Sequence, residues 1–177
     1  YHNPYATEYY TAEVNAYIHA NAVRDMALAS NPDYPVIGDQ YDWPVNVNID
    51  DNCNAFYNGS SITFFTSGGG CNNTAFSDVV YHEYGHHLVN TAGSGQGQYG
   101  EGMSDCVAIL ISDQPQMGIG FYNCSEGIRN ADNDFMYPCG GEIHYCGQLI
   151  SGCVWDLREQ LMITEPDNWQ QILRDLT

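Results

Sequence analysis

Basic side chains are almost missing from this sequence. It contains no lysine, and its four arginines stand against 22 acidic residues, which gives a net charge of −18. A charge of this size repels nucleic acid and anionic membrane surfaces. We therefore expect no nucleic-acid partner, and we interpret the acidic surplus as a contribution to solubility.

Long apolar runs are missing as well. No stretch approaches the ~18 apolar residues that cross a membrane, so no membrane insertion is expected. No signal peptide is visible and the chain begins at Tyr1 rather than at Met, which favours a mature or excised product. Hydrophobic residues make up 44% and charged residues only 15%, a composition that supports a folded core rather than a disordered acidic chain.

Cysteine spacings typical of zinc ribbons are also absent. None of the seven cysteines forms a Cys-x-x-Cys pair. Disulfides explain them better, and they imply the oxidising surroundings of a secreted, extracellular protein. Cys53 and Cys71 flank an apparent hairpin and make a plausible bridge, whereas the pairing of the other five stays open. The odd count leaves one free thiol or one cysteine bonded to another chain.

The hydrophobic pattern of the first half predicts one long helix and a small sheet. Apolar residues at helical spacing predict a helix over 6–29, which an Asn-Pro-Asp sequence ends. Alternation of apolar and polar residues predicts a strand over 45–49. An Asn-Gly turn between 55–57 and 61–65 predicts a β-hairpin.

The second half is predicted to be mostly helical. The expected elements are a helix capped by Ser77 or Asp78 and ending near residue 90, a glycine-rich loop over 91–100, a helix over 102–111, an irregular stretch over 115–141 and a last helix over 143–162. The fold class is therefore α+β, in a single domain of residues 1–177. We expect an N-terminal lobe of about 1–93 and a short helical C-terminal lobe of about 94–177, consistent with a truncated chain.

Two histidines beside a glutamate form the main chemical motif. His82 and His86 are four residues apart and lie on one face of a helix, so both imidazoles can bind one zinc ion. Glu83 is adjacent and suited to take a proton from a zinc-bound water. His87 is rotated by ~100° from His86. We expect it to be structural, with a backbone carbonyl as its partner.

A third ligand is expected from the next helix. Glu101 would return beside the two histidines if the helices form an antiparallel hairpin. Asp105, one turn later, could accept the remaining N–H of a ligand histidine. The position six residues after His86 is Ala92, which excludes the arrangement with a third histidine there.

Several short blocks together resemble a known family. In order, they are Val14-Asn-Ala-Tyr17, Asn54-Ala-Phe-Tyr-Asn-Gly59, Asp78-Val-Val-Tyr-His-Glu-Tyr-Gly-His86, Gly100-Glu-Gly-Met-Ser-Asp105, Glu142-Ile-His144, Gly147-Gln-Leu-Ile-Ser-Gly152 and Trp155-Asp-Leu157. Over about residues 11–157 the chain is similar to the thermolysin-like and fungalysin-like gluzincin metallopeptidases.

The resemblance implies a zincin-like fold of two lobes and a secreted zinc-dependent endopeptidase acting on proteins or peptides. It implies the following roles: zinc ligands His82, His86 and Glu101; general base Glu83; support of a ligand histidine by Asp105; stabilisation of the oxyanion by His144; and substrate binding by Asn54, Ala55 and Arg129. For Arg129 an ordinary ion pair is an equal alternative.

The sequence departs from the family pattern at several places. The gap between the second histidine and Glu101 is short, and the family's oxyanion tyrosine has no clear counterpart, with Tyr99 as a candidate. Cys139 replaces the aspartate that would orient His144, which leaves Asp132, Asp134 or Glu142 for that role. Asp78 matches a family Ca²⁺ ligand, but the carboxylates that complete the site are not evident, so a helix N-cap is favoured.

Two other functions stay open on the sequence alone. The chain could be a non-catalytic, structural or surface-assembled protein built on a peptidase scaffold, although Glu83 has no purpose in a purely structural zinc site. It could also be an aminopeptidase, although the edge strand expected at Asn54 and Ala55 favours a peptide that extends through the cleft.

Overall fold

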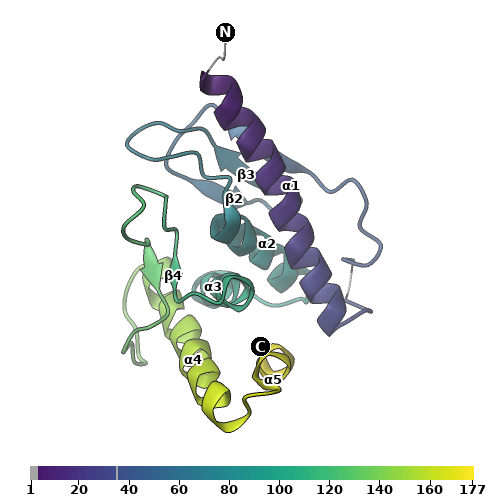
Figure 1. Ribbon diagram of the computed structural model, residues 1–177, viewed down its shortest axis with the longest axis vertical. Coiled ribbons are helices and arrows are strands. Elements are labelled where there is room, and N and C mark those ends of the chain that lie inside the picture. The colour runs from purple at the N-terminus through teal and green to yellow at the C-terminus, as the bar shows by residue number, and fades with distance from the viewer. Residues whose placement is uncertain (1–3, 35) are drawn as a thin grey trace.

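The computed structural model describes residues 4–34 and 36–177, and over this part of the chain it is an α+β structure, as predicted. The elements are α1 (Pro4–Ser30), β1 (Val45–Ile49), β2 (Ala55–Tyr57), β3 (Ile62–Phe65), α2 (Ser77–Thr91), α3 (Gln98–Ser112), β4 (Gln116–Met117), β5 (Arg129–Asn130), α4 (Ile143–Thr164) and α5 (Trp169–Leu176). Figure 1 shows the larger sheet at one end of the molecule, α4 and α5 at the other, and α2 and α3 between them, with α1 running from the sheet end past α2.

The N-terminal sheet has the strand order β1–β3–β2. The central strand β3 is buried along its whole length and pairs parallel to β1 and antiparallel to β2. The hairpin predicted around the Asn-Gly turn is therefore confirmed, and β2 lies at one edge of the sheet. The Cys53–Cys71 disulfide is also confirmed. It holds the segment before β2 to the loop that leads from β3 towards α2.

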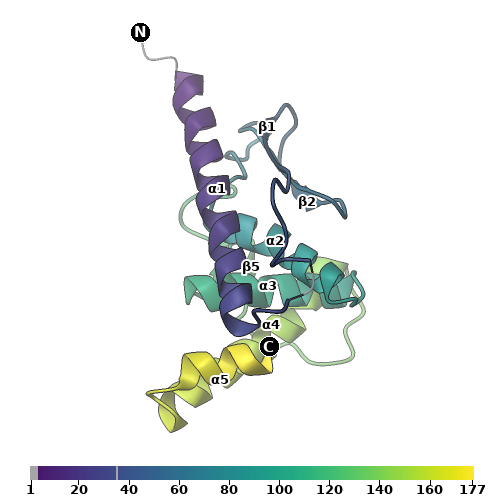
Figure 2. The same ribbon diagram turned by 90° about the vertical axis from the view of Figure 1, so that its right-hand side faces the viewer.

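Helix α1 buries a stripe of small side chains. Ala12, Ala16, Ala20, Val23 and Ala27 recur at three- and four-residue intervals and are all buried. Small residues let this long helix lie close to α2 and β1, and Figure 2 shows it running along one side of the molecule. The predicted helix is confirmed, with bounds slightly wider than expected.

The three central helices cross closely because glycines lie at their contacts. A Cβ atom on Gly85 of α2 would lie 2.8 Å from the Cα atom of Ser104 in α3. A Cβ on Gly102 of α3 would lie 2.6 Å from the carbonyl oxygen of Gly147 in α4. Larger residues would force the helices apart, so these glycines set the distance between the elements that carry the site.

Some predicted boundaries in the second half are wrong. Helix α3 starts at Gln98 rather than 102, because Gly97, with φ 72°, ends the loop and precedes the helix. The helix at 143 is not the last one. Helix α5 follows it and buries Leu173. The stretch expected to be irregular contains the short antiparallel pair β4 and β5.

The predicted cap of α2 is wrong as well. Phe76 occupies the N-cap position, and no side chain caps the helix there. Asp78 lies inside the first turn, where its Oδ2 accepts a hydrogen bond from the backbone N–H of Gly118 at 2.6 Å. Its charge still lies at the positive end of the helix dipole.

The cysteines form fewer bridges, and leave more thiols, than the sequence indicated. A second disulfide joins Cys139 and Cys146. Cys106 is a buried thiol, and Cys124 and Cys153 are exposed thiols. In the part of the chain that the structure describes, no helix is both long and apolar enough to cross a membrane.

Candidate functional site

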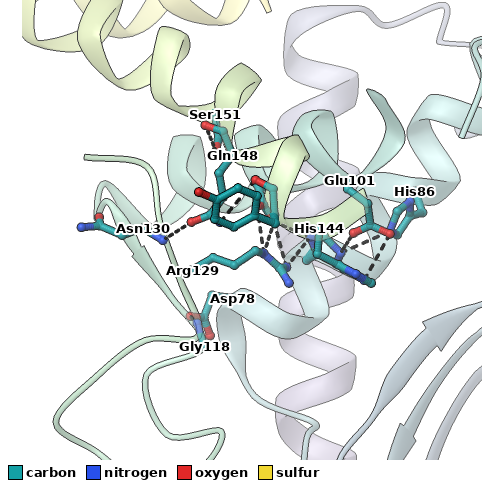
Figure 3. A network of polar contacts seen from close by, with 12 residues as sticks. Asp78, His86, Glu101, Gly118, Arg129, Asn130, His144, Gln148 and Ser151 are labelled. Atoms are coloured by element: carbon teal, nitrogen blue, oxygen red, sulfur yellow. Dashed lines mark hydrogen bonds and ion pairs between the residues drawn. The ribbon is translucent and has the colours of Figure 1, made fainter. Parts of the chain in front are cut away.

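Helices α2 and α3 bring His82, His86 and Glu101 together in a buried cluster. Their ligand atoms all lie within 4.8 Å of one another. The Nε2 atoms of the two histidines are 3.1 Å apart. The carboxylate of Glu101 lies 3.2 Å from Nε2 of His82 and 3.6 Å from Nε2 of His86. Figure 3 shows His86, Glu101 and His144 converging on one point.

These separations suit a bound metal ion. Ligand atoms at ~2.0–2.1 Å from a tetrahedral ion lie ~3.3 Å from one another, and the three observed distances surround that value. In addition, Glu101 Oε2 is buried, and its contact with Nε2 of His82 at 3.2 Å lacks the geometry of a well-aligned hydrogen bond. A buried carboxylate oxygen with a poorly placed donor is costly, and a cation would satisfy it. The cluster could therefore bind a metal ion.

Without the ion, the cluster holds a proton. Burial and the charge of Arg129 lower the pKa of His82, but hydrogen bonds to Asp105 and Glu101 outweigh them and raise it to about 9. Burial raises the pKa of Glu101, but hydrogen bonds and charges of the two histidines lower it well below its usual range. A cation is thus favoured here, and a metal would have to displace the proton from His82.

Asp105 lies directly behind His82. Its Oδ1 is 2.7 Å from Nδ1 of His82, which leaves Nε2 of the ring for the cluster. Arg129 donates to both oxygens of the same carboxylate at 2.9–3.1 Å. The predicted contact of Asp105 is present, and so is the ion pair considered for Arg129. Gln148 of α4 accepts from the backbone N–H of Asn130 and so holds β5, which carries Arg129.

His86 has a partner that the sequence did not indicate. The side-chain amide of Gln96 contacts Nδ1 of His86 at 2.8 Å and its backbone carbonyl at 3.1 Å. Gln96 lies in the loop between α2 and α3, whose glycines allow many backbone conformations, so the sequence does not determine the course of the loop. No spacing rule relates a loop residue to a ring on the preceding helix, so no signal in the sequence could have found it.

His144 lies at the first turn of α4 and faces the cluster. Its Nε2 is 3.3 Å from Glu101 Oε1, yet it does not belong to the group of ligand atoms. Of the three candidates for orienting it, Glu142 makes the contact, with Oε1 2.6 Å from Nδ1 of His144. Glu142 also caps α4 by accepting from the backbone N–H groups of His144 and Tyr145. Asp132 and Asp134 are exposed and do not take this role.

Glu83 faces a cleft beside the cluster. It lines two adjoining hollows together with Asn54, Ala55, His82 and His144. One of them is bounded by apolar side chains and by Arg129; the apolar residues are Val79, Met117, Phe121 and Ile128. Burial raises the pKa of the Glu83 carboxyl. The cleft therefore combines a buried carboxyl, an exposed imidazole and the edge of the sheet.

Two sequence-based expectations fail at the site. Tyr99 lies away from the cleft and lines a different hollow beside Tyr34 and Leu88. His87 has side-chain partners rather than a backbone carbonyl. Its ring lies 2.9 Å from the amide of Gln40 and 3.2 Å from the hydroxyl of Tyr57, and it stacks on a tryptophan.

Asp78 lies outside the metal cluster. Among the described residues, the group with metal-ligand geometry is the His-His-Glu cluster alone. The contacts of Asp78 are to the backbone of Gly118, so the structure adds no further carboxylate to the proposed Ca²⁺ ligand.

No match was found for this chain when it was compared with models of protein families and with curated proteins. The residues of the site are therefore what indicates a function for this chain.

Proposed function

We propose that this chain is a secreted, zinc-dependent endopeptidase with a zincin-like fold. The observation that carries the proposal is the cluster of His82, His86 and Glu101 beside the buried Glu83. Two imidazoles and one carboxylate are a ligand set typical of catalytic zinc, which keeps a fourth position for water or substrate. The two disulfides are compatible with an oxidising, extracellular location.

Zinc bound there would lower the pKa of its water and polarise a substrate carbonyl. Glu83 is the base in this scheme. Its raised pKa brings it closer to neutral pH, which suits a group that takes a proton from water and passes it to the leaving amine. A structural zinc site has no use for a buried carboxyl at this position.

His144 would donate a hydrogen bond to the developing oxyanion. Its Nδ1–H donates to Glu142, so Nε2 faces the cleft and can donate only when the ring carries a proton on both nitrogens. Half of the side chain is exposed, which leaves room for a substrate. Donors placed where charge develops are usually a large contribution to catalysis.

The substrate would lie along β2. Asn54 and Ala55, at the start of this edge strand, line the cleft beside Glu83. An extended peptide can pair with a free strand edge through its backbone. Arg129 borders the same cleft, and its guanidinium is paired with Asp105. In this proposal it stays in the wall of the cleft and contacts a substrate carbonyl from there.

The products of a long peptide test the proposal. Zinc-loaded protein is incubated with an N-terminally blocked peptide of about 30 residues, and the products are identified by mass spectrometry. Internal cleavage that stops when zinc is removed is the expected result. Release of single residues from an unblocked peptide only would favour an aminopeptidase, and no cleavage would favour the non-catalytic scaffold.

A further inference from the structure

Gln96 makes two contacts with one residue of the metal cluster. Its side-chain oxygen lies 2.8 Å from Nδ1 of His86, and its side-chain nitrogen donates to the backbone carbonyl of His86 at 3.1 Å. Gln96 lies in an exposed loop. An unrestrained glutamine there would sample several rotamers, and these two hydrogen bonds restrict it to one.

The two contacts fix the proton of His86. A carbonyl oxygen only accepts hydrogen bonds, so the NH₂ group of the amide must face it. The amide oxygen must then face Nδ1, which therefore carries a proton. A metal ion can then bind His86 only at Nε2, and this is the atom that lies 3.1 Å from Nε2 of His82.

Gly100 leaves the space that this amide occupies. A Cβ atom on Gly100 would lie 2.6 Å from the side-chain oxygen of Gln96. Gly100 is buried in the first turn of α3, directly before Glu101. Because the atom in the way is the end of a flexible side chain, even a methyl group at residue 100 would push the amide away from His86.

We propose that Gln96 is a positioning residue that fixes His86 in its metal-binding tautomer, and that Gly100 is required because the Gln96 amide fills the space beside it. This inference rests on the proposed zinc site. The cluster then has matched supports, with the Asp105 carboxylate behind His82 and the Gln96 amide behind His86. Such supports raise metal affinity by holding the ring and its tautomer.

Zinc affinity of four variants tests the proposal. The zinc dissociation constant is measured by competition with a chromophoric chelator, and thermal unfolding of the metal-free protein is measured beside it. Gln96→Met keeps the length of the side chain without the acceptor, and we expect zinc to bind ~10–100-fold more weakly. Gln96→Glu keeps the acceptor for Nδ1 but loses the donor to the His86 carbonyl, so it should bind zinc more tightly than Gln96→Met.

Gly100→Ala should weaken zinc binding as Gln96→Met does, although alanine has a higher helix propensity than glycine. The double variant should be no weaker than either single one. Gly95→Ala is the matched control in the same loop, where an added Cβ meets nothing within 4 Å, and should change nothing.

Unchanged zinc affinity in Gln96→Met or Gly100→Ala would overturn the proposal, as would a loss explained by unfolding of the metal-free variants. An original chain that fails to bind zinc would overturn both this inference and the proposed function. If the original chain binds zinc without cleaving peptides, only the peptidase proposal fails, because the affinities still report on Gln96.

Discussion

His82 and Glu101 lie on two packed helices with side chains only 5% and 9% exposed, whereas His144 lies at the start of α4 with 48% of its side chain exposed. The first pair is held by long-range packing of α2 against α3, including the close approach at Gly85. His144 is held by interactions with residues nearby in the sequence, namely a hydrogen bond to Glu142 and a disulfide between residues 139 and 146.

This difference in burial and support indicates that the two parts of the site have different roles. A buried cluster on helices is rigid, as a metal site requires, and its loss should affect metal binding and stability together. An exposed histidine on a locally braced turn can meet a substrate, and its loss should affect catalysis alone. The following changes test that separation.

The largest effect is expected from Glu101→Ala. Removal of a ligand should weaken zinc binding by more than the ~100-fold lost when only a supporting residue is removed. The rise in unfolding temperature that zinc gives the original chain should disappear, because that rise depends on affinity. Calorimetry with and without zinc checks this. Glu159→Ala, at an exposed helical glutamate, is the control, and equal zinc-dependent stabilisation in both variants would contradict the buried-cluster account.

A smaller and more selective effect is expected from His144→Phe. The catalytic constant should fall by ~10²–10³-fold, the usual loss of one oxyanion donor, while zinc affinity and unfolding temperature stay the same. Tyr145→Phe is the matched control, since a phenylalanine keeps the tilted ring contact with Phe135. Loss of zinc from His144→Phe would show that this histidine is a ligand, and the separation of the two regions would be wrong.

The smallest effect concerns pH and the metal-free protein. The folded pKa of His82, about 9, lies above its ordinary value of 6.5 because the hydrogen bonds to Asp105 and Glu101 outweigh burial. Protonated His82 therefore stabilises the metal-free fold below about pH 6.5, and this stability is lost as pH rises to about 9. We expect the unfolding temperature to fall by on the order of 10 °C over this range. The fall should be smaller in Asp105→Asn, and a flat profile in the original chain would count against the proton in the cluster.

The same two regions differ in how well the sequence predicts them. Residues four apart, such as His82 and His86, lie on the same face of a helix, and a hairpin of helices brings Glu101 back to them. The sequence therefore predicted the helix-borne part of the site, including Asp105. It left three candidates for the partner of His144, because residues 115–141 have no period that fixes where a side chain points.

The sequence did not predict the contacts that loops make. Gln96 and the Cys139–Cys146 bridge depend on the path of glycine-rich segments, which sequence patterns do not determine. Helix α5 was missed because it is short and its burial depends mainly on Leu173 packing against the rest of the chain. Local periodicity predicts elements, whereas these features depend on tertiary contacts.

Hydrolysis of casein by the original chain and by Glu83→Gln, with zinc content measured on both, tests the central claim most directly. The substitution keeps the shape of the side chain and leaves the three ligands untouched, so both proteins should carry about one zinc. The account predicts that the original chain cleaves casein and that the variant is at least ~10²-fold slower, as expected for loss of a general base. Equal rates in the two proteins, or zinc in both with no cleavage by either, would contradict it.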